Sequence, residues 1–324
     1  MVASVHAPGG MEAAPAGLAS GAVKVPSFLI IGAAKAGTTS LNHYLAQHPQ
    51  VFMSPRKDTF FFYFDGQPPD YGGPGDNAWY RARAVIEGSA YRALFAGVTS
   101  EKAVGEACTQ YLYDPDAAAR IHRDLPQAKL IAVLRDPVER AYSSFLQQVR
   151  DGYETTADFA EALALEPQRR RAKWRPMWHY KARGFYFAQL ERYLAHFERG
   201  RLGIYLYDDL QRDPRRLLRE IFDFLEVDPS FTPDVSVRHN RAGLPRSRRL
   251  HRLVMTPNPL KSLVRPLLPG RLRAMVKAAV TDSQLNLRRP SLPEDLRRRL
   301  VADYRDDVLK LQDLIRRDLS GWLA

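Results

Sequence analysis

Two short apolar runs in the first half of the chain are each followed by a segment of helical periodicity. The first run, residues 27–32 (SFLIIG), begins after Pro26 and is typical of a strand buried on both faces. A stretch of small residues (AAKAGTTS) follows, and from Thr38 onward the apolar residues recur at helical spacing. The pattern predicts a strand, a tight loop and a helix that begins near Thr38.

The second run, residues 128–134 (AKLIAVL), repeats this arrangement. It ends in Arg135-Asp136-Pro137, and a proline suits the first turn of a helix. Helical spacing then continues at Val138, Tyr142, Phe145 and Val149.

There are four candidate strands in all. Residues 102–107 and 202–207 are candidates in addition to the runs over 27–32 and 129–134. Strands that alternate with helices predict an α/β fold, here a single domain with a mainly parallel sheet and helices on both faces. Open sheets of this kind bind ligands at the carboxyl ends of their strands. The residues that directly follow the first and third strands are therefore the first candidates for a site.

The composition agrees with a folded α/β domain. Of the 324 residues, 45% are hydrophobic and 26% are charged, which excludes a disordered or fibrous chain. No apolar stretch approaches the ~18 residues of a transmembrane helix. Residues 1–23 are rich in Ala, Gly and Pro and are expected to form a disordered leader before a domain over 24–324. The single cysteine, Cys108, cannot form an internal disulfide, which favours a reducing, cytoplasmic compartment.

The net charge of +12 is concentrated in one segment. Residues 238–300 contain 16 Lys and Arg but only 3 Asp and Glu. A basic segment indicates an anionic partner, which leaves nucleic acid, an acidic membrane, or an anionic nucleotide or acceptor open.

The loop after the first strand has the residue types of a phosphate-binding loop. Gly32 and Gly37 are separated as in the pattern G-x-x-x-x-G-K-[ST], but Thr38 stands at the lysine position and Lys35 lies inside the loop. Free N–H groups and the helix dipole attract an anion at such a helix start. ATP-binding loops of this type work with an acidic residue at the end of a later strand, which holds magnesium. The sequence shows no convincing residue of that kind. The alternative is an ordinary turn with an exposed lysine.

Arg135 and Ser143 are candidates for a second phosphate. Arg135 leaves the carboxyl end of a strand and Ser143 lies on the following helix. A guanidinium can donate two parallel hydrogen bonds to phosphate oxygens. The alternative is a local ion pair of Arg135 with Asp136 or Glu139.

Together these motifs resemble those of sulfotransferases that use 3′-phosphoadenosine 5′-phosphosulfate. KAGTTSL and, about a hundred residues later, LRDPVERAYSSF are similar to the two cofactor motifs, and the order and spacing agree. The closest resemblance is to the branch of heparan sulfate sulfotransferases and their bacterial relatives. Three further segments resemble that branch, namely GEACTQYL (105–112), RGFYFAQLERYLAHF (183–197) and LYDDLQRDP (206–214).

The resemblance implies a P-loop-nucleotide-kinase-like sulfotransferase fold and a role for each motif. The 5′-phosphosulfate would lie on the loop of Lys35, Ala36, Gly37, Thr38, Thr39 and Ser40. Arg135 and Ser143 would bind the 3′-phosphate, and Arg246 would help to close a C-terminal loop over the nucleotide. Lys35 would stabilise the oxygen that leaves sulfur, so that no metal is needed. The product would be adenosine 3′,5′-bisphosphate.

The resemblance also places a general base at Asp58. The family carries a carboxylate in a K-E-x-x-[FY]-F setting, and here the segment reads KDTFFF, with Asp58 at the glutamate position. The alternative is a loop carboxylate paired with Lys57 or Arg56, and Asp65 and Glu106 are weaker candidates for the base. At the position of Glu106, heparan sulfate enzymes also have a glutamate, and a lysine follows it. This chain has Ala107 in place of that lysine.

The sequence thus predicts a metal-independent sulfotransferase acting on a hydroxyl or amine of a carbohydrate, lipid or small metabolite. A P-loop-like small-molecule kinase and a basic nucleic-acid-binding protein are the two alternatives. Nucleic acid is not expected as a partner, because aromatic residues that could stack on bases are sparse in residues 238–300. Aromatic residues at 60–64, 174, 178 and 180 are expected either to line the acceptor cleft or to fill core. The acceptor and the oligomeric state cannot be read from the sequence.

Overall fold

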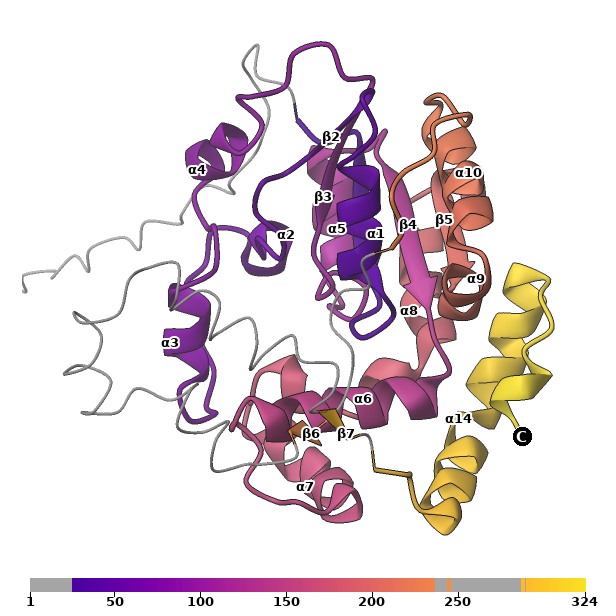
Figure 1. The fold of residues 1–324 in the computed structure, drawn as a ribbon. Coiled ribbons are helices and arrows are strands. Elements are labelled where there is room, and N and C mark those ends of the chain that lie inside the picture. The colour runs from indigo at the N-terminus through magenta and orange to yellow at the C-terminus, as the bar shows by residue number, and fades with distance from the viewer. Residues whose placement is uncertain (1–24, 237–243, 246–286, 289) are drawn as a thin grey trace, which may run out of the picture.

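The computed structural model describes residues 25–236, 244–245, 287–288 and 290–324. Five parallel strands form one sheet in the order β2-β3-β1-β4-β5 (Figure 1). This confirms the predicted single α/β domain with a parallel sheet. The strands are β1 (Phe28–Gly32), β2 (Val51–Met53), β3 (Ala103–Ala107), β4 (Lys129–Leu134) and β5 (Leu202–Leu206).

Four of these strands lie within one residue of the predicted runs, and β2 was missed. A strand of three residues is too short to show a periodic pattern. Every residue of β1 and β3 is buried, because helices cover both faces of the sheet. Phe28 of β1 is paired with Gly105 on one side and with Lys129 on the other, which places β1 at the centre.

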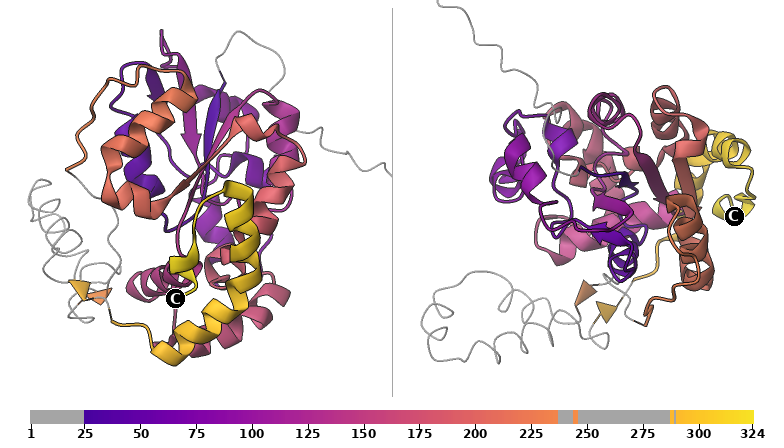
Figure 2. Two further views of the ribbon diagram at one scale, coloured as in Figure 1. Left: turned by 90° about the vertical axis from the view of Figure 1, so that its right-hand side faces the viewer. Right: turned by 90° about the horizontal axis from the view of Figure 1, so that it is seen from above.

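Helices lie on both faces of the sheet, as predicted. Helices α1 (Thr38–Leu45) and α10 (Pro214–Leu225) lie on one face, and α5 (Ala117–Asp124) and α8 (Tyr186–Leu194) on the other (Figures 1 and 2). Helix α1 begins at the predicted residue. The final long helix, α14 (Glu294–Ile315), packs against α8.

Helix α6 (Pro137–Arg150) crosses below the carboxyl ends of the strands (Figure 1). Its start is fixed locally, as the sequence predicted. Pro137 is the first helical residue, and the Asp136 carboxylate accepts hydrogen bonds from the backbone N–H groups of Val138 (2.8 Å) and Glu139 (3.2 Å). This cap holds one face of α6 against the edge of the sheet where ligands bind.

The remaining elements surround this edge or lie at its periphery. The α-helices are α2 (Phe61–Phe64), α3 (Asp76–Arg81), α4 (Gly88–Ala93), α7 (Phe159–Arg171) and α9 (Tyr207–Arg212). Short 3₁₀ turns span Pro176–Trp178, Ala182–Gly184, Arg199–Arg201 and Ser320–Trp322. Two short antiparallel strands, β6 (Leu244–Pro245) and β7 (Leu287–Arg288), pair with each other.

Three predictions fall on residues that the structure does not describe. The expected leader over 1–23 lies outside the described residues, and so do most of the basic segment and Arg246. Among the helices that are described, none has the length and apolar character needed to cross a bilayer.

Candidate functional site

A cavity of about 790 Å³ opens where the strands end. The segment after each of the five strands contributes lining residues, as expected for an open parallel sheet. Helix α6 forms a further wall. Residues of both predicted phosphate-binding motifs therefore line the same cavity as Asp58.

The loop before α1 lines the cavity through Lys35 and Gly37, and the first turn of α1 lines it through Thr38, Thr39 and Ser40. Its other predicted member, Ala36, has no exposed surface and packs in the core. Gly37 has φ +83, and a Cβ atom there would lie 2.8 Å from Leu210 Cδ2. Both the backbone conformation and the space therefore require glycine at the start of α1.

Lys35 is held in an unusual state in this loop. Its φ of +71 is rare for a side chain other than glycine. Burial, reinforced by the positive charge of Arg150, lowers the pKa of Lys35 to about 7. An anion placed against this lysine would favour its protonated form, so the loop is poised to bind negative charge.

Arg135 links the two motifs. Its Nη1 donates a hydrogen bond to the backbone carbonyl of Lys35 at 3.1 Å, and its guanidinium lies 4.9 Å from the centre of the Tyr207 ring. Nη2 also contacts the Glu139 carboxylate at 3.3 Å, so the local ion pair considered as an alternative is present. Ser143 lies one turn beyond Glu139 on α6 and also lines the cavity.

A second arginine completes this cluster from a distant part of the chain. Arg297 of α14 lies 3.3 Å from a carboxylate oxygen of Asp136 and 3.6 Å from one of Glu139. Glu139 is thus shared between Arg135 and Arg297. Sequence analysis missed Arg297, because it lies in a helix where acids and bases alternate without a motif.

Asp58 is anchored beside the cavity by three polar contacts. One carboxylate oxygen lies 2.7 Å from Lys57 Nζ, so the pairing considered as an alternative is present. The other oxygen accepts hydrogen bonds from the backbone N–H of Thr109 (3.1 Å) and from its hydroxyl (3.4 Å). The Asp58 side chain is 35% exposed, and its backbone φ is +56. The carboxylate is therefore fixed in direction and still accessible.

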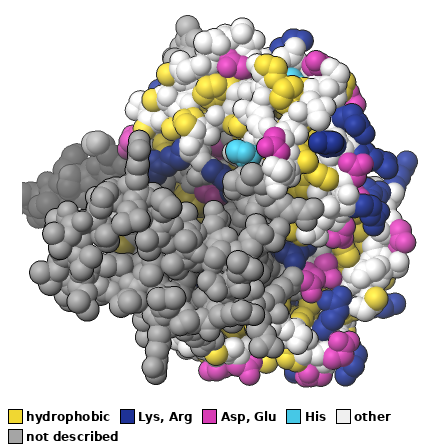
Figure 3. Space-filling model, in the orientation of Figure 1, with side chains coloured by type: hydrophobic (Ala, Val, Ile, Leu, Met, Phe, Trp, Pro, Cys, Tyr) yellow, Lys and Arg dark blue, Asp and Glu magenta, His cyan; other side chains and the backbone are white. Residues whose placement is uncertain are grey.

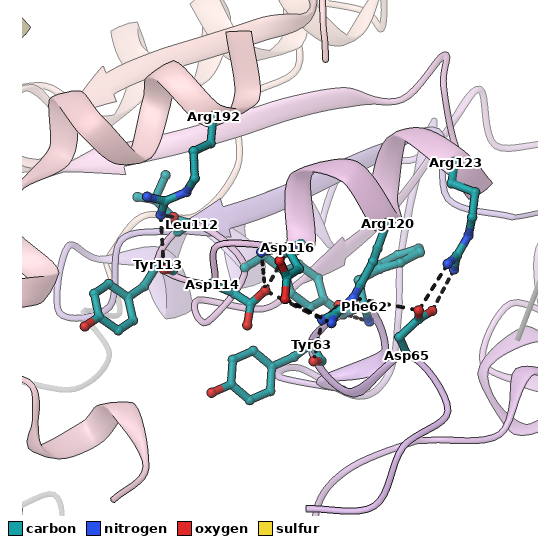
Figure 4. A network of polar contacts seen from close by, with 12 residues as sticks. Phe62, Tyr63, Asp65, Leu112, Tyr113, Asp114, Asp116, Arg120, Arg123 and Arg192 are labelled. Carbon is teal, nitrogen blue, oxygen red and sulfur yellow. Dashed lines mark hydrogen bonds and ion pairs between the residues drawn. The ribbon is translucent and has the colours of Figure 1, made fainter. Parts of the chain in front are cut away.

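The two weaker candidates for the base do not line the cavity. Asp65 is paired with Arg123 at 2.6 Å and with Arg120 at 3.7 Å in a separate polar network (Figure 4). The hydrogen bond from Arg123 lowers the pKa of Asp65. Glu106 is fully buried, and it accepts hydrogen bonds from the hydroxyl groups of Thr59, Tyr91 and Tyr111. Burial also raises the pKa of Glu106. Because its carboxyl group is enclosed by these hydroxyl groups in the core, Glu106 does not reach the cavity.

The cavity has two chemically different ends, one lined by Trp79 of α3 and the other by residues of α9 and by Trp322. Helices α3 and α9 lie on opposite sides of the molecule in Figure 1. The Trp322 end consists of Arg135, Tyr207, Asp208 and Trp322, whose indole N–H donates to Asp208 at 3.3 Å. The Trp79 end combines the apolar side chains of Phe60, Trp79 and Met177 with the polar ones of Lys57, Asp58, Thr109 and Gln110. Arg135, Asp58 and Phe60 were named from the sequence, and Gln110, Tyr207 and Asp208 lie in the two segments quoted for the resemblance, 105–112 and 206–214. Met177 and Trp322 were not found from the sequence.

Most aromatic residues expected in the acceptor cleft or the core belong to the core. Phe61, Phe62, Phe64, Trp178 and Tyr180 are buried, whereas Phe60 is buried but also borders the cavity. The described ranges contain no group of three or more His, Cys, Asp or Glu side chains arranged to hold a metal.

The fold and the site define an α/β protein with a nucleotide-type phosphate loop at the carboxyl edge of its sheet. Residues 26–233 match the family model described as "Sulfotransferase family", and the chain belongs to this family. This confirms the resemblance drawn from the motifs. A sulfotransferase structure from Alicyclobacillus acidocaldarius is 35% identical with a TM-score of 0.73, over 93% of this chain and 100% of that one.

Curated relatives share the family but are longer. Heparan sulfate glucosamine 3-O-sulfotransferase 3A1 of Mus musculus is 30% identical over 219 residues, which is 66% of this chain and 50% of that protein. Membrane-associated sulfotransferase kil1 of Dictyostelium discoideum is 33% identical over 121 residues, which is 37% of this chain and 22% of that protein. The chain thus spans half or less of the length of these two relatives.

Proposed function

We propose that the chain transfers a sulfuryl group from 3′-phosphoadenosine 5′-phosphosulfate to a hydroxyl or amine of an acceptor. The observation that carries the proposal is the joining of Lys35 and Arg135 by a hydrogen bond within a cavity that also holds Asp58. Two cationic anchors for phosphate and a carboxylate for a proton are the groups that this transfer requires. The family membership supports the same reaction.

The residues present fit this nucleotide. The start of α1 and Lys35 would hold the 5′-phosphosulfate, and Arg135 with Ser143 would hold the 3′-phosphate. At the same end of the cavity, Tyr207 and Trp322 offer flat surfaces on which the adenine ring of the nucleotide could stack. Arg246 stays a prediction, because it lies outside the described residues. When bound, the nucleotide supplies an activated sulfuryl group with a good leaving oxygen.

The side chains of this protein have distinct tasks in an in-line displacement. The Lys35 ammonium stabilises the negative charge that grows on the leaving oxygen. Asp58 accepts the acceptor proton on a carboxylate oxygen, and the Thr109 N–H keeps the other oxygen in place. Lys57 lies against the proton-accepting oxygen, so its ammonium must move away or share that oxygen as the proton transfers.

The two alternative functions find less support. A magnesium-dependent kinase would need an acidic residue at the end of a strand to hold the metal. In this cavity Asp136 caps α6 and contacts Arg297, Asp58 is paired with Lys57, and Asp208 accepts a hydrogen bond from Trp322. A nucleic-acid-binding protein would need a continuous basic surface. On the described part of the face in Figure 3, basic and acidic side chains are interspersed. The acceptor class and the cytoplasmic location remain predictions from the sequence.

Thermal shift measurements test the proposal. Adenosine 3′,5′-bisphosphate should raise the melting temperature, whereas ATP with magnesium should not. Stabilisation by ATP with magnesium alone would support the kinase instead. Salt-sensitive DNA binding without an effect of either nucleotide would support the nucleic-acid-binding protein.

A further inference from the structure

Three apolar side chains form one wall at the Trp79 end of the cavity, beside the proposed base. Phe60 and Trp79 are in edge contact, with ring centres 5.8 Å apart, and Met177 lines the same end. Asp58 is tied to this wall through Thr109, whose carbonyl accepts a hydrogen bond from Arg183 at 3.2 Å. The same Arg183 lies 3.9 Å from the Met177 sulfur. The base and the apolar wall are therefore parts of one rigid unit.

The Trp79 ring is fixed in place from its own surroundings. The guanidinium groups of Arg83 and Arg175 lie 4.6 and 4.3 Å from its centre. Arg175 is only 1% exposed and pairs with Asp76 at 2.8 Å. The Asp76 carboxylate neutralises the charge of Arg175 inside the protein. Arg175 therefore supports the Trp79 ring without presenting a cation to the cavity.

The described lining offers little positive charge to an acceptor. Its cationic side chains are Lys35, Lys57 and Arg135. Lys35 and Arg135 belong to the nucleotide in the proposed function, and Lys57 is paired with Asp58 at 2.7 Å. The cations near the Trp79 end are Lys57, which the Asp58 carboxylate holds until the proton transfers, and Arg83 over the Trp79 ring, which is not part of the described lining. An anionic group at this end would meet the Asp58 carboxylate.

Gln110 adds one uncharged polar group to this end. It is 4% exposed, and its side-chain nitrogen donates to the Tyr80 hydroxyl at 3.0 Å. Its side-chain oxygen has no hydrogen-bond partner. A buried amide oxygen without a partner is costly.

We infer that the acceptor carries its hydroxyl or amine on a flat, uncharged and largely apolar frame that packs against Phe60, Trp79 and Met177. This inference rests on the proposed function and names the acceptor class. It differs from the anionic acceptor left open by the basic segment, most of which lies outside the described residues.

Three matched alcohols test the inference by binding to the protein with and without adenosine 3′,5′-bisphosphate. They are 2-naphthylmethanol, the same alcohol with an added ring carboxylate, and methyl β-D-glucopyranoside. The neutral naphthyl alcohol should bind at least about tenfold more tightly than either of the others. Tighter binding of the carboxylate or of the sugar, or no saturable binding of the naphthyl alcohol, would overturn the inference.

Variants locate the binding to the wall. Met177→Ala and Trp79→Ala should each weaken naphthyl binding about tenfold, and Trp79→Phe should retain most of it. Adenosine 3′,5′-bisphosphate affinity should stay within about twofold in all three. Leu309→Ala, at an exposed apolar position on α14, is the matched control and should change neither. Unchanged naphthyl binding in both alanine variants contradicts the inference, whereas a wild-type protein that fails to bind the bisphosphate contradicts the proposed function.

Discussion

Arg135 donates a hydrogen bond to the backbone carbonyl of Lys35, at 3.1 Å, and thereby joins two segments that are a hundred positions apart in the chain. The bond connects the residue after β4 with the loop after β1. These two strands are neighbours in the sheet, so their carboxyl ends lie close together. The two proposed phosphate sites are consequently held at a fixed separation by the sheet itself.

Lys35→Ala should reduce turnover by roughly 10²-fold or more, the effect of losing one preorganised donor to the transition state. Binding of adenosine 3′,5′-bisphosphate should fall much less. Steady-state assays with labelled cofactor and nucleotide titrations measure the two effects. Lys102→Ala, at an exposed lysine, is the control. Near-normal turnover in Lys35→Ala would remove this lysine from the mechanism.

Arg135→Ala should weaken adenosine 3′,5′-bisphosphate binding by about 10²-fold, because a charge-assisted hydrogen bond pair is lost. Adenosine 5′-phosphate, which lacks the 3′-phosphate, should lose little of its weaker affinity. Calorimetric titration of both nucleotides provides the comparison, with Arg299→Ala as an exposed control. Equal losses for both nucleotides would show that Arg135 supports the fold of the loop instead.

Glu139→Gln should tighten adenosine 3′,5′-bisphosphate binding by about fivefold. The carboxylate occupies Arg135 at 3.3 Å and would repel an incoming phosphate, and the amide removes that repulsion. Adenosine 5′-phosphate affinity should remain unchanged. The same calorimetric comparison decides, and weaker binding of the bisphosphate in Glu139→Gln would mean that Glu139 mainly orients Arg135.

Asp58→Asn should lower turnover by ~10²–10⁴-fold, because the amide cannot take the acceptor proton. Nucleotide affinity should change little, and the acidic limb of the pH–rate profile should disappear. Asp58→Glu should retain far more activity than Asp58→Asn, since it restores the carboxylate. The assay should use an alkyl alcohol as acceptor, because a phenol is acidic enough to react with little help. Wild-type turnover in Asp58→Asn would place the base elsewhere.

Lys35→Met should stabilise the nucleotide-free protein in a pH-dependent way. The pKa of Lys35 is about 7 in the folded protein, against 10.5 in the ordinary case, so its protonated form destabilises the fold. That cost is fully present below pH 7 and disappears as the pH rises from about 7 to 10.5. The gain in melting temperature of Lys35→Met over wild type should therefore be largest at pH 6 and smallest near pH 10. A gain that is independent of pH would contradict the lowered pKa.

Much of the fold and half of the site could be predicted from local sequence patterns. Apolar runs identified β1 and β4, and residues 102–107 and 202–207 were proposed as the strands that the structure shows as β3 and β5. The loop types after β1 and β4 pointed to Lys35 and Arg135 as site candidates. Strand β2 was missed because three residues carry no period. The pairings of Arg135 with Glu139 and of Asp58 with Lys57 were foreseen as alternatives, and the structure places both beside the cavity.

The sequence by itself determined the alternation of strands and helices and the family, and it predicted a phosphate-binding role for the first loop. These features depend on residues close together in the chain, where hydrophobic period, caps and glycine positions act directly. Only the tertiary structure decided which side chains from distant segments lie together around the cavity. Trp79, Met177, Arg297 and Trp322 belong to separate elements without a shared motif, and they reach the site because the sheet order and helix packing bring those elements to one edge. Burial of a side chain likewise depends on the assembled fold. Burial lowers the pKa of Lys35, and it encloses Glu106 in the core, away from the cavity.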